Sequence, residues 1–365
     1  MLGIAGAGAA VGQDRSEGIT EPTVFAPFDP QAPACGAPPG LKKALAFAQD
    51  NRREFMEGVS AGLAKAAVDR QLDYQVMVAD NDARKMIEQV QSLRQAKVGA
   101  VVAAPVDPGS LSPSLKEIIW AGGYVGTIVP PPATSLLNAP QYLTGKVLGD
   151  AAAAYINTEL NGKANVVLLT HDNLQFLAPR FVAMRDSLKG MPGVNIVADV
   201  SPATVDNQGG FATMNLILLA HPDVDVVLGA DTVVLGALQA LRAAGKDRPD
   251  QFLGGIDGEP DAVAELKREA SPYKASISLA SPVFAYAMGQ HAADWLEGKS
   301  IPQAMDILPS TLTKENIARY EADIANPAGV YHDPQKRASY LRMYGNICYD
   351  SRDRYVNFPW SSETR

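Results

Sequence analysis

Short apolar runs alternate along the chain with longer amphipathic stretches, beginning near Leu41. Each run has the length of a strand, and segments of helix length separate them. The runs are residues 43–48, 74–79, 98–104, 124–129, 164–170, 194–200, 224–230, 252–256 and 274–279. They are apolar throughout rather than alternating, as expected when helices cover both faces of a parallel sheet. The pattern therefore predicts a series of β-α units.

These units form two successive sets of four or five, which predicts an α/β protein with two doubly wound, Rossmann-like lobes. A chain of 365 residues also exceeds the usual size of one compact core. In open parallel sheets, ligands bind beyond the carboxyl ends of the strands, and nearly all residues that follow the apolar runs are polar or acidic. We therefore expect a ligand cleft between the lobes.

The formal net charge of -8, without any basic stripe, excludes the electrostatic footprint of a nucleic-acid-binding protein. Hydrophobic residues make up 47% of the chain, an ordinary globular value. No segment reaches the roughly 18 to 20 unbroken apolar residues of a membrane-spanning helix.

Residues 1–40 differ from the body of the chain. The opening MLGIAGAGAAVG contains a glycine cluster, but no central strand precedes it and no periodic helix follows, so we expect no dinucleotide cofactor there. Its short apolar run matches the middle of a secretory signal, and we interpret it as an export-signal remnant. Residues 21–40 are rich in Pro, Ala and Gly, which is typical of an extended leader.

The two cysteines, Cys35 and Cys348, lie near opposite ends of the chain and exclude a zinc cluster of the paired-cysteine type. Two interpretations stay open. In an exported protein they can form one disulfide that ties the leader to the tail, and otherwise they are two unpaired thiols. Residues 318–365 hold six of the twelve tyrosines, so we predict an ordered C-terminal tail, residues 326–365, that wraps the fold.

Two segments carry a resemblance to a known family: HPDVDVVLGADTVVLGALQALRAAGK (221–246) and GGIDGEPDAV (254–263). They resemble the second lobe of the type I periplasmic sugar-binding proteins, the ribose and galactose group that serves ABC importers. The helix at 62–82, the AAPVDP turn, the GKANVVLLT strand and the segment at 300–317 are similar in order and spacing. The resemblance covers about residues 41–320.

The resemblance implies a type I periplasmic binding protein fold, in which two lobes are joined by a three-crossing hinge and close on a ligand. It places the crossings near Pro140, Ser281 and Pro309. The implied division is residues 41–140 plus 281–308 for lobe 1, 141–280 plus 309–325 for lobe 2, and 326–365 for an aromatic-rich extension.

The function implied is that of an exported, monomeric receptor that captures a small sugar or polyol and delivers it to the membrane permease of an ABC importer. The alternative is a periplasmic sensor protein, for chemotaxis or quorum signalling, with a non-sugar or anionic ligand. An enzyme is disfavoured, because the sequence has no nucleophile elbow, phosphate loop or zinc triad, and its four histidines are scattered. We expect neither a cofactor nor a nucleic-acid partner.

Three candidate ligand contacts match family positions: Asn51 after the first strand, Asp231, and Asp257. Both aspartates stand just before predicted helices, so each has an alternative interpretation as a helix N-cap. The Asp-Arg pair of typical members is replaced by Val129 and Pro130, which makes the usual sugar clamp doubtful.

Replacement groups are expected in the loops NRREF and HDNLQF, where guanidinium and amide groups can bind hydroxyl groups and aromatic rings can stack on a sugar. These candidates are Arg52, Arg53, Phe55, His171, Asn173, Gln175 and Phe176. Arg180 lies two residues beyond Ala178, the position at which the family has an arginine. Each of them has an alternative interpretation as a solvent-exposed or core residue. His171 has no second His or Cys at metal-ligand spacing, so no metal site is expected.

Overall fold

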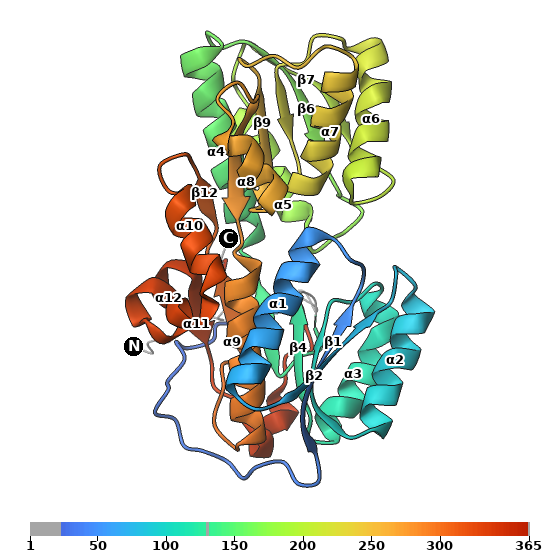
Figure 1. Ribbon diagram of the computed structural model, residues 1–365, viewed down its shortest axis with the longest axis vertical. Coiled ribbons are helices and arrows are strands. Elements are labelled where there is room, and N and C mark those ends of the chain that lie inside the picture. Colours follow the sequence, from blue (N-terminus) through green and yellow to red (C-terminus); the bar gives the residue numbers. More distant parts are fainter. Residues whose placement is uncertain (1–22, 129–130, 364–365) are drawn as a thin grey trace, which may run out of the picture.

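The chain forms two parallel sheets, one in each of two lobes (Figure 1), in a computed structural model that describes residues 23–128 and 131–363. The segment MLGIAGAGAAVG, which we interpret as an export-signal remnant, lies outside the described residues. So do Val129 and Pro130, the positions at which the usual sugar clamp is altered. The structure has the predicted α/β fold class, because each lobe contains a sheet of mainly parallel strands covered by helices.

The first lobe contains a seven-stranded sheet in the order β13-β11-β5-β4-β3-β1-β2, in which only β13 runs antiparallel to its neighbour. Its strands are β1 (Lys42–Gln49), β2 (Asp73–Val78), β3 (Val98–Ala103), β4 (Tyr124–Ile128), β5 (Ser135–Asn138), β11 (Ala304–Ile307) and β13 (Leu341–Tyr344). Helices α1 (Glu54–Asp69) and α9 (Ser281–Leu296) pack together on one face, and α2 (Ala83–Gln95) and α3 (Pro108–Trp120) pack on the other.

The second lobe contains a six-stranded sheet in the order β12-β10-β9-β8-β6-β7, in which β12 is the antiparallel member. Its strands are β6 (Ala164–Leu169), β7 (Val194–Val200), β8 (Val226–Leu228), β9 (Phe252–Asp257), β10 (Tyr273–Ser278) and β12 (Ser310–Leu312). Its helices are α4 (Gln141–Glu159), α5 (Ala178–Leu188), α6 (Asn207–Ala220), α7 (Asp231–Ala243) and α8 (Pro260–Lys267). The pairs α4 with α5 and α6 with α7 pack tightly.

All nine predicted strands are present, but two of them are not buried on both faces. β2 and β7 each form one edge of their sheet, and their residues are exposed or half-buried. The prediction of fully covered strands was wrong for these two, because an edge strand has a neighbour on one side only and its covering helices do not extend beyond it.

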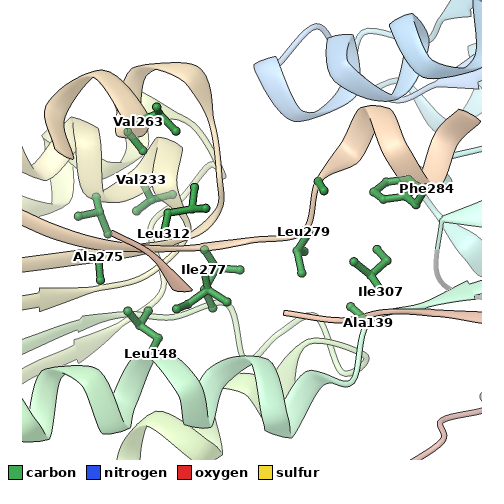
Figure 2. Packing of buried hydrophobic residues seen from close by; sticks show 14 of the residues in the cluster. Ala139, Leu148, Val233, Val263, Ala275, Ile277, Leu279, Phe284, Ile307 and Leu312 are labelled. Carbon is green, nitrogen blue, oxygen red and sulfur yellow. The ribbon is translucent and has the colours of Figure 1, made fainter. Parts of the chain in front are cut away.

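The chain passes between the two sheets at three places: from β5 to α4, from β10 to α9 and from β11 to β12. Figure 2 shows Ala139, Leu279 and Ile307, one residue from each passage, close together in the packing between the lobes. All three are buried and belong to the same apolar cluster. The hydrophobic core therefore continues from one lobe into the other along the three connections.

The leader and the tail are joined to each other and to the first lobe. A disulfide links Cys35 to Cys348, which decides between the two interpretations of the cysteines. The indole N–H of Trp360 donates to the carbonyl oxygen of Thr23 at 2.9 Å. Helix α10 (Ile317–Ala325) leads into the tail, which contains α11 (Pro327–His332), α12 (Pro334–Tyr340), β13 and the 3-10 helix η1 (Tyr349–Arg354). None of the described helices has the length and apolar character needed to cross a bilayer.

Replacing both Cys35 and Cys348 by serine is expected to lower the free energy of unfolding by about 2 to 4 kcal/mol. The disulfide closes a loop with a sequence separation of 313, so it restricts the unfolded chain strongly. Urea unfolding with and without a reductant measures the effect. The reductant should destabilise the wild-type chain and leave the double variant unchanged. Identical unfolding curves for the two proteins without reductant would contradict the prediction.

Candidate ligand-binding site

The carboxyl ends of β1 and β9 deliver two polar loops to the boundary between the lobes. The first loop leads into α1, whose first turn faces the second lobe (Figure 1). The second leads from Asp257 into α8. Across the boundary, the backbone N–H of Asp261 donates to Oε2 of Glu54 at 3.5 Å. The two loops therefore meet at the boundary between the lobes, where the sequence predicts the ligand cleft.

On the first-lobe side, the loop after β1 is held by its own side chains. The guanidinium group of Arg53 donates to Oδ2 of Asp50 at 2.6 Å and to Oδ1 of Asn51 at 3.0 Å. The side-chain amide of Asn51 donates to Oδ1 of Asn81 at 2.9 Å. These bonds fix Asn51 and Arg53 at the cleft and neutralise much of the charge of Arg53.

On the second-lobe side, Asp257 ends β9 with a φ of 131°, a left-handed conformation that a non-glycine residue adopts only under strain. Such strain, about 1 to 3 kcal/mol, is concentrated at functional sites. Burial raises the pKa of Asp257 to about 7, the charge of Arg180 opposes this rise, Asp231 adds to it, and Arg53 opposes it. The Asp257 carboxyl group thus lies within the electrostatic influence of Arg180 on its own lobe and of Arg53 on the other.

Arg180 is 6% exposed and lies near the start of α5. Its Nε donates to Oε1 of Gln141 at 2.9 Å. α5 comes very close to α4 here, because a Cβ atom on Gly145 would lie 1.8 Å from the carbonyl oxygen of Arg180. Although the charge of Arg180 acts on Asp257, the two form no ion pair with each other in the described chain. A ligand with several hydroxyl groups can bridge them.

Asp231, the second candidate taken from the family position, is enclosed by hydrogen-bond donors of its own lobe. Its side chain is 0% exposed. Oδ2 accepts hydrogen bonds from the backbone N–H groups of Gly258 and Glu259 and from the hydroxyl of Ser276, and Oδ1 accepts one from the hydroxyl of Tyr273. It makes no side-chain capping bond either. Asp231 instead fixes the loop that carries Asp257.

Two candidates of the first loop contribute little to the cleft. The side chain of Arg52 is 70% exposed, and its nearest acidic partner is Glu57 at 3.9 Å. Phe55 is half-buried, and its ring packs against Phe284 with centroids 5.9 Å apart. These surroundings agree with the solvent-exposed interpretation of Arg52 and the core interpretation of Phe55, while ligand contact by either residue stays a prediction.

The loop between β6 and α5 carries four further candidates. Asn173 and Gln175 are exposed, Phe176 is half-buried, and His171 is 3% exposed. The His171 ring lies edge-on to Phe181, and its Nε2 has no partner among the described residues. Burial and then the charge of Arg180 lower the pKa of His171, so the ring is neutral beside the cleft.

Two residues of the site were not among the sequence candidates. Gln141, the first residue of α4, orients Arg180. Glu259 is 4% exposed, its Oε1 has no partner among the described residues, and burial together with the charge of Asp257 raises its pKa to about 9. A signal for Glu259 was available, because it lies in the acidic loop DGEPD directly after a predicted strand. No group of three metal-ligating side chains occurs among the residues that the structure describes.

The sequence profile of the periplasmic binding protein domain matches residues 44–300, which span both lobes. The chain belongs to the periplasmic binding protein family. Within this family it is 27% identical to the ribose import binding protein of Bacillus subtilis over 278 residues, which cover 70% of this chain and 86% of that protein. It is also 27% identical to a xylitol-binding protein of Mycolicibacterium smegmatis, over 66% of this chain and 68% of that protein.

Solved structures of periplasmic binding proteins share its fold. An ABC transporter solute-binding protein from Bacillus halodurans with bound myo-inositol superposes with a TM-score of 0.68 at 21% identity, over 77% of this chain and 98% of that one. The type I periplasmic binding protein fold expected from the sequence is therefore confirmed.

Proposed function

We propose that this protein is an exported receptor that captures a small sugar or polyol between its lobes and presents it to the membrane permease of an ABC importer. The two relatives described above are named as ribose- and xylitol-binding proteins, and the solved structure contains bound myo-inositol. Members of the family bind their ligands rather than convert them, which supports a receptor that releases its ligand unchanged.

The pair formed by Asp257 and Arg180 is the observation that carries this proposal. The charge of Arg180 acts on Asp257 although the two form no ion pair among the described residues, and the charge of Arg53, which belongs to the other lobe, acts on Asp257 as well. A compact polyhydroxylated molecule offers donors to the carboxylate and acceptors to the guanidinium group. Closure of the lobes then buries both faces of the ligand.

An anionic ligand fits this cleft poorly. That alternative depended on a fork formed by Arg52 and Arg53, but Arg52 points to solvent and Arg53 is paired with Asp50. Burial raises the pKa of both Asp257 and Glu259, so these surroundings disfavour negative charge and would disfavour that of an anionic ligand as well. We therefore favour the sugar or polyol receptor over a sensor of anions.

Thermal unfolding of the purified chain against a panel of pentoses, hexoses, amino sugars, polyols, inositols and sugar acids tests the proposal. A ligand at one hundred times its dissociation constant adds about 2.7 kcal/mol to the free energy of unfolding and raises the melting temperature by a few degrees. We expect a selective shift with a neutral or aminated member, and recovery of that ligand unchanged after denaturation. A shift restricted to sugar acids, conversion of the ligand, or no shift at all would contradict the proposal.

A further inference from the structure

Glu259 is a buried carboxyl group without a hydrogen-bond partner, at the beginning of α8. It occupies the N-cap position of that helix, yet its side chain makes no capping hydrogen bond. It is 4% exposed, and its Oε1 accepts no hydrogen bond from any residue that the structure describes. Buried polar atoms in folded proteins are nearly always hydrogen-bonded. This oxygen is therefore an acceptor whose donor comes from outside the chain.

The loop that carries Glu259 lies at the boundary between the lobes, because the backbone N–H of Asp261, two residues further along, donates to Oε2 of Glu54 on the other lobe at 3.5 Å. Burial is the largest cause of its raised pKa, followed by the charges of Asp257, Asp231 and Glu54, whereas Arg53 acts in the opposite direction. Asp257 and Asp231 belong to the second lobe, and Glu54 and Arg53 belong to the first. Glu259 thus lies beside Asp257 in the cleft to which the proposed function assigns the ligand.

The carboxyl groups of Asp257 and Glu259 lack a directly paired basic group. Arg180 is an unpaired basic group there, whereas Arg53 is already paired with Asp50. Asp257 and Glu259 have no basic side chain within ion-pair distance in the described chain. Burial raises the pKa of Glu259 to about 9, so this carboxyl group is protonated in the empty cleft, and a guest that brings one positive charge would stabilise its ionised form.

We infer that the ligand is an aminated sugar or polyol whose ammonium group binds between the carboxyl groups of Asp257 and Glu259. This inference rests on the proposed function and specifies its ligand class. An ammonium group has three N–H donors, which suits two neighbouring carboxyl groups that lack donors of their own. The hydroxyl groups of the same ligand then remain for Arg180 and Asn51. A metal ion is not an equivalent guest, because the described residues provide no cluster of three ligands for it.

Matched pairs of probes test this inference: glucosamine and glucose, galactosamine and galactose, 1-amino-1-deoxysorbitol and sorbitol, and an aminated inositol and myo-inositol. Isothermal titration at pH 7 gives both affinities of each pair for the wild-type chain, for Glu259→Gln and for the control Glu269→Gln. Glu269 is exposed on the same lobe, so its replacement removes the same charge away from the cleft.

We expect at least one amine to bind about tenfold or more tightly than its hydroxyl partner to the wild-type chain. Glu259→Gln should reduce that ratio several-fold, whereas Glu269→Gln should leave it unchanged. Because burial keeps Glu259 protonated in the empty cleft, binding of the amine should also release a proton, which appears as a heat that depends on the buffer.

Preferential binding of the hydroxyl members, or a preference for amines that Glu259→Gln leaves intact, would overturn the inference while the proposed function stands. Absence of binding by both members of every pair would overturn the proposed function and the inference with it. Even if the Glu259→Gln variant does not fold, the affinities of the amine and hydroxyl members for the wild-type chain show whether an amine is preferred.

Discussion

Replacing Asp257 by asparagine should weaken binding of the preferred sugar or polyol about 10- to 100-fold. The carboxylate can accept charge-assisted hydrogen bonds from ligand donors, and each such bond contributes about 1.5 to 3 kcal/mol. Asparagine keeps the shape but turns one acceptor oxygen into a donor, which meets a ligand donor unfavourably. Isothermal titration with the ligand that gives the largest thermal shift in the panel measures the loss.

Asp261→Asn is the matched control for this experiment. Asp261 is exposed four residues further along the chain, and only its backbone N–H contacts the other lobe. The control should keep its affinity within about a factor of two, since exposed charges contribute little. Equal affinities for the wild-type chain and Asp257→Asn would remove Asp257 from the site. Urea unfolding of both variants verifies that each is folded.

Replacing Asp231 by alanine should lower the free energy of unfolding by about 3 to 5 kcal/mol. Four buried donors, two backbone N–H groups and the hydroxyls of Tyr273 and Ser276, would lose their acceptor at once. Part of the loss is offset, because burial raises the pKa of Asp231 and the charged carboxylate is itself costly to bury. The midpoint of urea unfolding measures the change.

Asp223→Ala provides the comparison for Asp231, because Asp223 is an exposed aspartate of the same lobe. Its replacement should change the free energy of unfolding by no more than about 0.5 kcal/mol. A stable Asp231→Ala variant that has lost only ligand affinity would show that Asp231 is a ligand contact after all, as the family position suggests.

The longer strands were predictable because their signal is local. The runs at 164–170 and 194–200 correspond to β6 and β7 to within one residue. β5, β11 and β12 were not predicted, because segments of three or four residues are too short to show a period. β13 depends on its pairing with β11, which lies far away along the chain, so only the general course of the tail could be anticipated.

In the candidate site, too, the sequence predicts which residues follow the strands but not which side chains surround them. Asp231 and Asp257 look alike in the sequence, since each follows a strand and precedes a helix. They differ because the donors of Tyr273 and Ser276, from a later strand, surround Asp231 alone. Arg52 and Arg53 are neighbours, but only Arg53 meets an acidic partner at close range, in Asp50. These differences arise from tertiary contacts that no local pattern contains.

The disulfide between Cys35 and Cys348 has a practical consequence for observing this protein at work. It occupies both cysteines of the chain, so the folded protein offers no other thiol to a labelling reagent. A cysteine introduced at the rim of the cleft, as in Asp261→Cys, would be the single attachment point for a fluorophore. Because Asp261 lies opposite Glu54 on the other lobe, the dye would experience a different polarity whenever the lobes move relative to each other. Because the cysteines of the leader and the tail are bonded to each other, a fluorescent reporter can be attached at the rim of the cleft without labelling a second site.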